Sequence, residues 1–233
     1  MRRRNRPNQT QWRHVHQWGS ARSFEIARFL NETCLQWLVA AAKSVPAPEL
    51  EIFQRNLDLW RQFDSRACAR AARNPVVLID CNFARADWWE SAVGRGVRPV
   101  RSSGSQKYFI VEDARSVLRE ILIEARTIAV AEPRAAHLIF GAPSVGVRLL
   151  ASMSLADIDR IAVEYHAELR PRWAERTVFW RNLLSAAIGD TDDTMSGLYC
   201  HSLQLLGAEI LNSTAACENG VVEHLLLASL RQG

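Results

Sequence analysis

Apolar residues recur at steps of three and four positions along most of this chain, and prolines interrupt the pattern. The stretch 23–43 is typical, with apolar side chains at 24, 27, 30, 34, 38 and 41. Because an α-helix turns once in 3.6 residues, these positions share one helix face. The spacing therefore predicts amphipathic helices, and it constrains the fold more than any other feature.

The same spacing predicts further helices throughout the chain. They cover 49–73, 84–93, 112–131, 154–169, 173–188, 195–211 and 221–230, with a short one that Ser144 caps. Pro46, Pro75 and Pro171 mark helix ends, since proline has no amide hydrogen and disfavours helix in the residue before it. Two short apolar runs, 76–79 and 108–111, are suited to strands, and the first is equally suited to a buried helical turn. We predict an all-α fold, a multi-helix bundle.

The chain's 233 residues are enough for one large domain or two small ones. Two sequence similarities recur at a spacing of 60 or 61 residues: 78–79 with 138–139, and 114–118 with 175–179. Either a duplicated helical unit or chance similarity in a chain rich in Arg and Ala explains them. We predict a basic arm at 1–20, a first helical module at 21–131 and a second at 132–233.

Basic charge is concentrated at the N-terminus. Of the 29 basic residues only Lys43 and Lys107 are lysines, and residues 1–28 hold seven arginines against one acid, Glu25. Either a GC-rich genome or a need for planar contacts to phosphate or carboxylate explains the arginine content. The arm is therefore either a phosphate-binding tail or a solvated terminus.

Several classes of function are disfavoured by missing motifs. The five cysteines include no C-x-x-C pair, and the six histidines lie at no ligand spacing, so we expect no metal and no cofactor. Nucleophile-elbow, Walker A, G-x-G-x-x-G and H-E-x-x-H sequences are absent, and Asp80-Cys81 fits a buried cysteine better than a nucleophile. We expect no catalytic residues and no enzyme activity. With no long apolar run and no apolar leader, we expect a cytoplasmic protein away from membranes.

One segment resembles a known family. The matching positions are Gly141, Leu150, Met153-Ser154-Leu155, Ile158, Arg160-Ile161-Ala162 and Arg172-Trp173. They resemble the conserved middle of FlhD, a subunit of the bacterial flagellar master regulator, and 138–142 is similar to a step in its partner FlhC. The resemblance extends over about 136–184.

The resemblance implies a helical transcriptional activator that works on promoter DNA with a second regulator subunit, at flagellar or conjugative-transfer genes. A true duplication would make the chain a covalent pseudo-dimer of such modules. Three features depart from the family. The chain is about twice as long as a typical member, it lacks FlhC's four-cysteine zinc cluster, and an acidic turn at 190–193 replaces C-terminal basic positions.

The segments 144–152 and 154–169 fit a helix-turn-helix arrangement. Four acids on the second helix repel phosphate, so it is a poor reader of the major groove: Asp157, Asp159, Glu164 and Glu168. We predict phosphate contacts from the flanking arginines and the arm instead. These DNA-binding candidates are Arg2, Arg3, Arg4, Arg6, Arg160, Arg170, Arg172 and Arg176. The alternative for each is a solvated or ion-paired side chain.

Most of the eight tryptophans lie at helical spacing among Leu and Phe, which favours core packing. The adjacent pair Trp88 and Trp89, together with Leu149 and Leu150, is our candidate partner interface, provided that the pair is exposed. The alternative function is a helical adaptor or cytosolic assembly subunit of a secretion or motility apparatus, which binds no nucleic acid.

Overall fold

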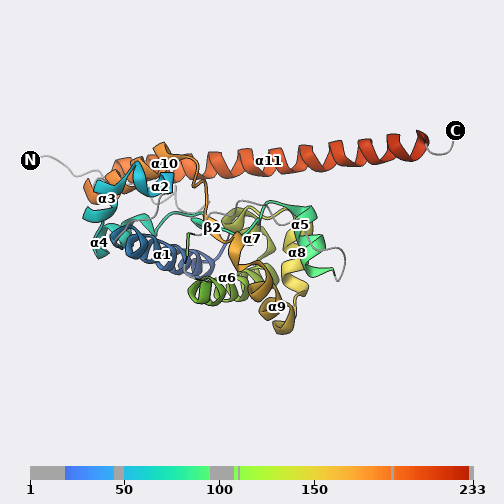
Figure 1. Ribbon diagram of the computed structural model, residues 1–233, viewed down its shortest axis with the longest axis horizontal. Helices are drawn as coiled ribbons and strands as arrows, with labels where there is room; N and C mark the ends of the chain where they lie inside the picture. The colour runs from blue at the N-terminus through green and yellow to red at the C-terminus, as the bar shows by residue number, and fades with distance from the viewer. Residues whose placement is uncertain (1–18, 45–49, 95–107, 110, 190–191, 231–233) are drawn as a thin grey trace, which may run out of the picture.

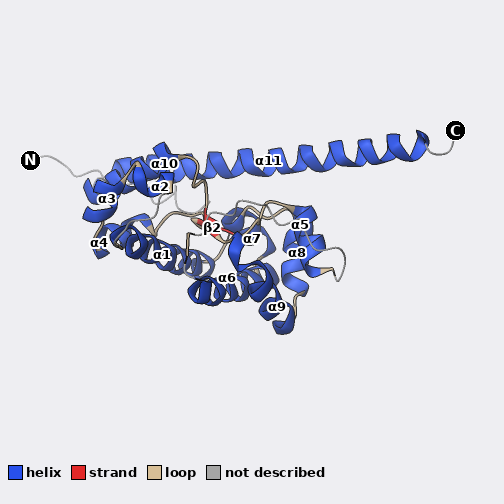
Figure 2. Cartoon of the chain, in the orientation of Figure 1, coloured by secondary structure: helices blue, strands red, loops and turns tan. Residues whose placement is uncertain are grey.

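The computed structural model describes residues 19–44, 50–94, 108–109, 111–189 and 192–230. Almost all of the regular structure is helical, so the all-α prediction is confirmed (Figures 1 and 2). The helices are α1 (Ala21–Lys43), α2 (Glu51–Gln54), α3 (Leu57–Gln62), α4 (Ser65–Ala71), α5 (Ala86–Val93), α6 (Val111–Ala131), α7 (Pro133–Phe140), α8 (Ser144–Ser152), α9 (Leu155–Tyr165), α10 (Thr177–Gly189) and α11 (Asp192–Leu230), with a 3-10 turn at His166–Glu168.

A two-residue antiparallel pair joins distant parts of the chain. Strand β1 (Ile79–Asp80) pairs with β2 (Arg170–Pro171), with Ile79 opposite Pro171 and Asp80 opposite Arg170. The amide of Arg172 continues the pairing by donating to the carbonyl of Leu78 at 2.7 Å. Of the two runs suited to strands, 76–79 therefore contributes only its last residue, and Val111 of the second run begins α6.

One hydrophobic core runs from α1 to α11, and its largest side chains include Trp60, Trp88, Trp89 and Trp180. Helix α6 packs against α7, α8 and α9, while α10 packs against α3 and α4. The core therefore crosses the predicted module boundary between 131 and 132. The duplication itself stays a prediction.

The predicted helix at 49–73 is wrong, because this segment forms three short helices, α2, α3 and α4. The buried side chain of Asn56 donates to the carbonyls of Ile52 and Thr177, at 3.3 and 3.4 Å, between α2 and α3. Asp64 then caps α4 by accepting from the Ala67 amide at 2.7 Å. Polar side chains that bond to backbone in this way compete with a continuous helix.

The two helices predicted at 195–211 and 221–230 are one continuous helix, α11. No proline occurs after Pro171, so nothing in the sequence removes a helical hydrogen bond between them. In Figure 1 this helix lies along one side of the body and continues beyond it.

Candidate functional site

Within the segment that carries the family resemblance, the predicted helix-turn-helix corresponds to two consecutive helices, α8 and α9, joined by Met153 and Ser154. Met153 at the turn is buried, and Ser154 caps α9 by accepting from the Asp157 amide at 3.1 Å. Asp157 returns the contact, accepting from the Ser154 amide at 3.0 Å, so the predicted capping box is confirmed with Asp in place of Glu. Helix α8 differs from prediction, because Pro143 and not Ser144 occupies its cap position.

Gly141 ends α7 in the left-handed conformation, with φ of 67°. A Cβ at this position would collide with Leu206 of α11 and would lie 3.3 Å from Nη2 of Arg172. Glycine is therefore required both by the backbone and by the close approach of α11. Two positions of the resemblance, Gly141 and Arg172, thus meet in space.

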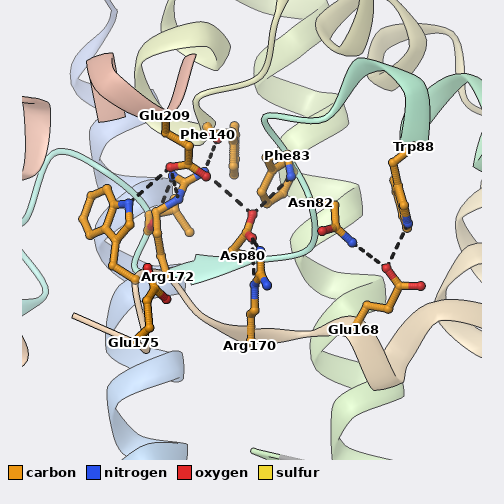
Figure 3. Close-up of polar contacts among 12 residues, drawn as sticks. Asp80, Asn82, Phe83, Trp88, Phe140, Glu168, Arg170, Arg172, Glu175 and Glu209 are labelled. Atoms are coloured by element: carbon orange, nitrogen blue, oxygen red, sulfur yellow. Dashed lines mark hydrogen bonds and ion pairs between the residues drawn. The ribbon is translucent and has the colours of Figure 1, made fainter. Parts of the chain in front are cut away.

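Arg172 lies at the centre of a buried charged junction between β1, β2 and α11 (Figure 3). Its side chain is only 1% exposed and donates to the carbonyls of Val77 and Phe140, at 3.3 and 2.5 Å. Its Nη2 lies 3.8 Å from Oδ1 of Asp80, and its Nε lies 3.5 Å from Oε2 of Glu209. The geometry of this Nε does not make it a hydrogen-bond donor. Burial of a guanidinium is tolerable only with such partners.

Asp80, with a side chain 4% exposed, holds the other side of the junction. Its Oδ2 accepts from Nε and Nη2 of Arg170, at 3.2 and 2.9 Å, and its Oδ1 accepts from the Phe83 amide at 3.1 Å. Glu209 accepts from the Trp173 indole at 3.3 Å. Burial raises the pKa of Glu209, and the charge of Arg172 opposes that shift. Two arginines and two carboxylates thus fasten α11 to the strand pair.

A second polar cluster lies beside this junction. Glu168 accepts from the side chains of Asn82 and Trp88, the latter at 2.9 Å. Asn82 holds a left-handed φ of 63°. Burial raises the pKa of Glu168, while these two hydrogen bonds lower it. The cluster joins the start of α5 to the 3-10 turn that follows α9.

The predicted partner interface is contradicted at three of its four positions, because Trp88, Trp89 and Leu150 are buried. The Trp88 ring packs edge-on against Tyr165, with centroids 5.1 Å apart, and Trp89 stacks on Phe83. These rings therefore join α5 to the core, and they present no surface to a partner. Leu149 is half-buried.

The arginines predicted to contact phosphate have different environments in the structure. Arg172 is wrong as a DNA contact, because it is buried and committed to the charged junction. Arg170 is bound to Asp80, and Arg160 donates to the Ala92 carbonyl at 2.7 Å and lies 3.4 Å from Glu164. Arg176 is 56% exposed, with Glu175 at 4.0 Å. Arg2, Arg3, Arg4 and Arg6 lie outside the described residues.

Two candidate chemistries can be compared with the described residues, a cysteine nucleophile and a metal site. Cys81 is buried, and burial raises its thiol pKa, which disfavours the nucleophilic thiolate. No group of three or more His, Cys, Asp and Glu among the described residues is arranged to hold a metal ion. Sequence analysis missed Glu209 altogether. The only sequence signal for Asp80 is its position after a buried apolar run.

Comparison of the chain with protein-family models, with curated proteins and with solved structures gave no match in any of the three. Among the described helices, none is by itself both long and apolar enough to cross a membrane; α7 and α8, bent by 115°, meet that length and composition only as a pair.

Proposed function

We propose that this protein is a helical, non-catalytic subunit of a transcription-regulating assembly. In this proposal it acts at promoter DNA with a partner subunit, in the manner of the FlhD/FlhC activators that it resembles. The supporting observation is that positions of the resemblance form one packed unit. Gly141 lies against Arg172, and Ser154 caps the helix between them.

The proposal assigns DNA contacts to arginines that the fold leaves at the surface. Arg160, Arg170 and Arg172 already bind carboxylates or carbonyls, so they have little capacity left for phosphate. Exposed arginines lie instead on or beside α4 and α10, which pack together. They are Arg73, Arg176 and Arg181. With the basic arm at 1–20, they supply the cations for backbone contacts, which position a protein on DNA without reading sequence.

One observation favours a second candidate, an adaptor that binds no nucleic acid. The arginines nearest the helix-turn-helix neutralise acids of this same chain, which is the arrangement expected when they serve stability alone. The two candidates differ in a single measurable property, the affinity for DNA.

Fluorescence anisotropy of a labelled 30-base-pair duplex, titrated with full-length protein, tests the choice. If about four phosphates are contacted, the affinity falls roughly 100-fold between 50 and 200 mM salt. Deleting residues 1–10, or changing Arg73 and Arg181 together to Gln, should weaken binding and flatten the salt dependence. Arg28→Gln on α1 is the matched control and should change neither. Absence of binding at 50 mM salt overturns the proposal in favour of the adaptor.

A further inference from the structure

The contact between Glu209 and Arg172 leaves a buried hydrogen-bond donor unused. Nε of Arg172 lies 3.5 Å from Oε2 of Glu209, yet it donates no hydrogen bond to any described residue, and the Arg172 side chain is only 1% exposed. A buried donor without an acceptor is costly, so it marks a place where a better-aligned acceptor would bind. In Figure 3 the Glu209 side chain reaches from α11 toward Arg172. Glu209 therefore occupies this place but fits the donor poorly.

A second donor faces the same carboxylate. The indole Nε1 of Trp173 donates to Oε2 of Glu209 at 3.3 Å, which is long for such a bond. Trp173 holds a left-handed φ of 55°, a strained conformation for a bulky residue. Its ring centroid lies 5.7 Å from Cζ of Arg172, within reach of a cation–π contact. The guanidinium and the indole are thus held together as a two-donor site suited to a carboxylate.

The charge balance of the junction sets the sign of the group that this site requires. Asp80 accepts from two nitrogens of Arg170, at 3.2 and 2.9 Å, so these two groups neutralise each other. The charge of Arg172 is then matched by Glu209. Withdrawal of Glu209 would leave one buried positive charge, which is unfavourable unless another anion replaces it.

Glu209 lies just beyond the tightly packed part of α11. Leu206 is 2% exposed, whereas the Glu209 side chain is 26% exposed and Leu211 is 71% exposed. Between the first two stands Gly207, where an added Cβ would meet no described atom within 4 Å. Glycine is a poor helix former, and no described contact requires one at this position. Bending at Gly207 would withdraw Glu209 and the half-buried Ile210 while Leu206 stays packed.

We propose that Arg172 and Trp173 form a carboxylate-binding site, and that Glu209 is its exchangeable internal occupant. When α11 bends at Gly207, Glu209 leaves, and a carboxylate of another molecule accepts from Nε of Arg172 and from the Trp173 indole in its place. Only hydrogen bonds and ion pairs form and break in this exchange. The ligand is a small free carboxylate or an acidic side chain of another protein, which share this chemistry. The inference is independent of DNA binding.

The variant Glu209→Ala vacates the site, and acetate is the probe. At pH 7 we expect acetate, but not chloride at equal ionic strength, to stabilise the full-length variant against urea. The unfolding equilibrium constant should fall about elevenfold at an acetate concentration of ten times Kd. Glu164→Ala is the matched control, because Glu164 is 31% exposed and pairs with Arg160, which also donates to a carbonyl. The control and Glu209→Gln, which keeps the site filled, should respond to both salts alike.

Amide hydrogen exchange of the wild-type protein tests whether Glu209 is exchangeable. If only the bent form binds acetate, acetate raises the population of that form by the factor measured for Glu209→Ala. We therefore expect the 208–211 amides to exchange faster by this factor in acetate than in chloride. Gly207→Ala should slow their exchange about fivefold in either salt. Gly197→Ala, where an added Cβ also meets no described atom, lies in the packed part of α11 and should leave it unchanged.

A blocked glutamate, N-acetylglutamate α-amide, distinguishes the two sources of the carboxylate. If it binds Glu209→Ala more tightly than acetate does, the site takes an acidic side chain; if its binding is equal or weaker, the site takes a small free carboxylate. Equal responses of Glu209→Ala to acetate and chloride overturn the inference. Wild-type exchange at 208–211 that acetate leaves unchanged also overturns it. Neither measurement involves DNA, so the outcome is separate from that of the proposed function.

Discussion

The two halves of α11 have opposite surroundings. In the half nearer the body, Leu206 is buried, Ser202 accepts from Asn74 at 2.7 Å, and Glu209 lies beside Arg172. In the half that projects, the sequence places acids and leucines with no cation in the same helix and no described element beside it. The comparison teaches that one uninterrupted helix divides into a part that the body anchors through Ser202, Leu206 and Glu209, and a part that extends past the other described elements.

The largest effect is expected from removing the cation that anchors the first half. Arg172→Ala leaves the buried Asp80 and the half-buried Glu209 without their shared partner, which costs about 3–5 kcal/mol of the free energy of unfolding. Urea unfolding followed by circular dichroism measures the loss. Arg176→Ala, at an exposed position four residues on, is the control and should stay within about 0.5 kcal/mol. Similar values for the two variants would contradict the assignment of Arg172 as the anchor.

A pair of leucines on the same helix locates the boundary between the halves. Leu206→Ala should lower the free energy of unfolding by about 2–5 kcal/mol, because that side chain is 2% exposed and packs where Gly141 lets the helix approach. Leu211→Ala, only five residues further, should change it by less than about 0.5 kcal/mol. Thermal and urea unfolding of both variants give the comparison. A large loss at Leu211 would move the boundary outward.

Local features of the fold could be predicted from the sequence, whereas long-range contacts could not. Apolar spacing predicted α1, α6 and α9, and the residues of the Ser154 capping box are visible in the sequence. Those features depend on neighbours within a turn or two of helix. The arginine partners of Asp80 lie about ninety positions away, and no spacing rule brings them together.

The usual exposure of a residue type was also a poor guide at two sites. Arginine is usually exposed, so Arg172 looked like a surface cation, although it is among the largest fully buried side chains. The adjacent Trp88 and Trp89 were a candidate partner contact only if the pair is exposed. The structure buries both, since Trp88 points toward Glu168 and Trp89 toward Phe83.

The Ser154 cap of α9 provides a test of how the α8–α9 turn is stabilised. Ser154→Ala should lower the free energy of unfolding by about 1 kcal/mol, since the Asp157 amide loses its side-chain acceptor. Ser185→Ala, at an exposed position on α10, is the matched control and should change it by less than about 0.5 kcal/mol. Chemical denaturation measures both. An unaltered Ser154 variant would mean that packing against α6 alone fixes the turn.

The smallest expected effect is a pH dependence that belongs to the anchored half. Burial raises the pKa of Glu209 above its usual 4.5, so the folded protein binds more protons than the unfolded chain as pH rises above 4.5. Its contribution to stability therefore falls with rising pH through that window. Glu209→Gln removes the titrating group. The free energy of unfolding of this variant, measured relative to that of the wild type, should therefore rise as pH increases from 4.5.

Asp87 is a control for that measurement, because its pKa is shifted in the opposite direction to that of Glu209. Its hydrogen bond from Arg85 lowers its pKa below 3.8, so its contribution is present above that value and is lost as pH falls below it. The free energy of unfolding of Asp87→Asn, relative to that of the wild type, should therefore rise only below pH 3.8. Urea titrations repeated at each pH measure this difference. If Glu209→Gln instead gained on the wild type as pH fell, attraction to Arg172 would outweigh burial. The junction would then hold Glu209 as a favourable ion pair, and the anchored half would be strongest where both groups are charged.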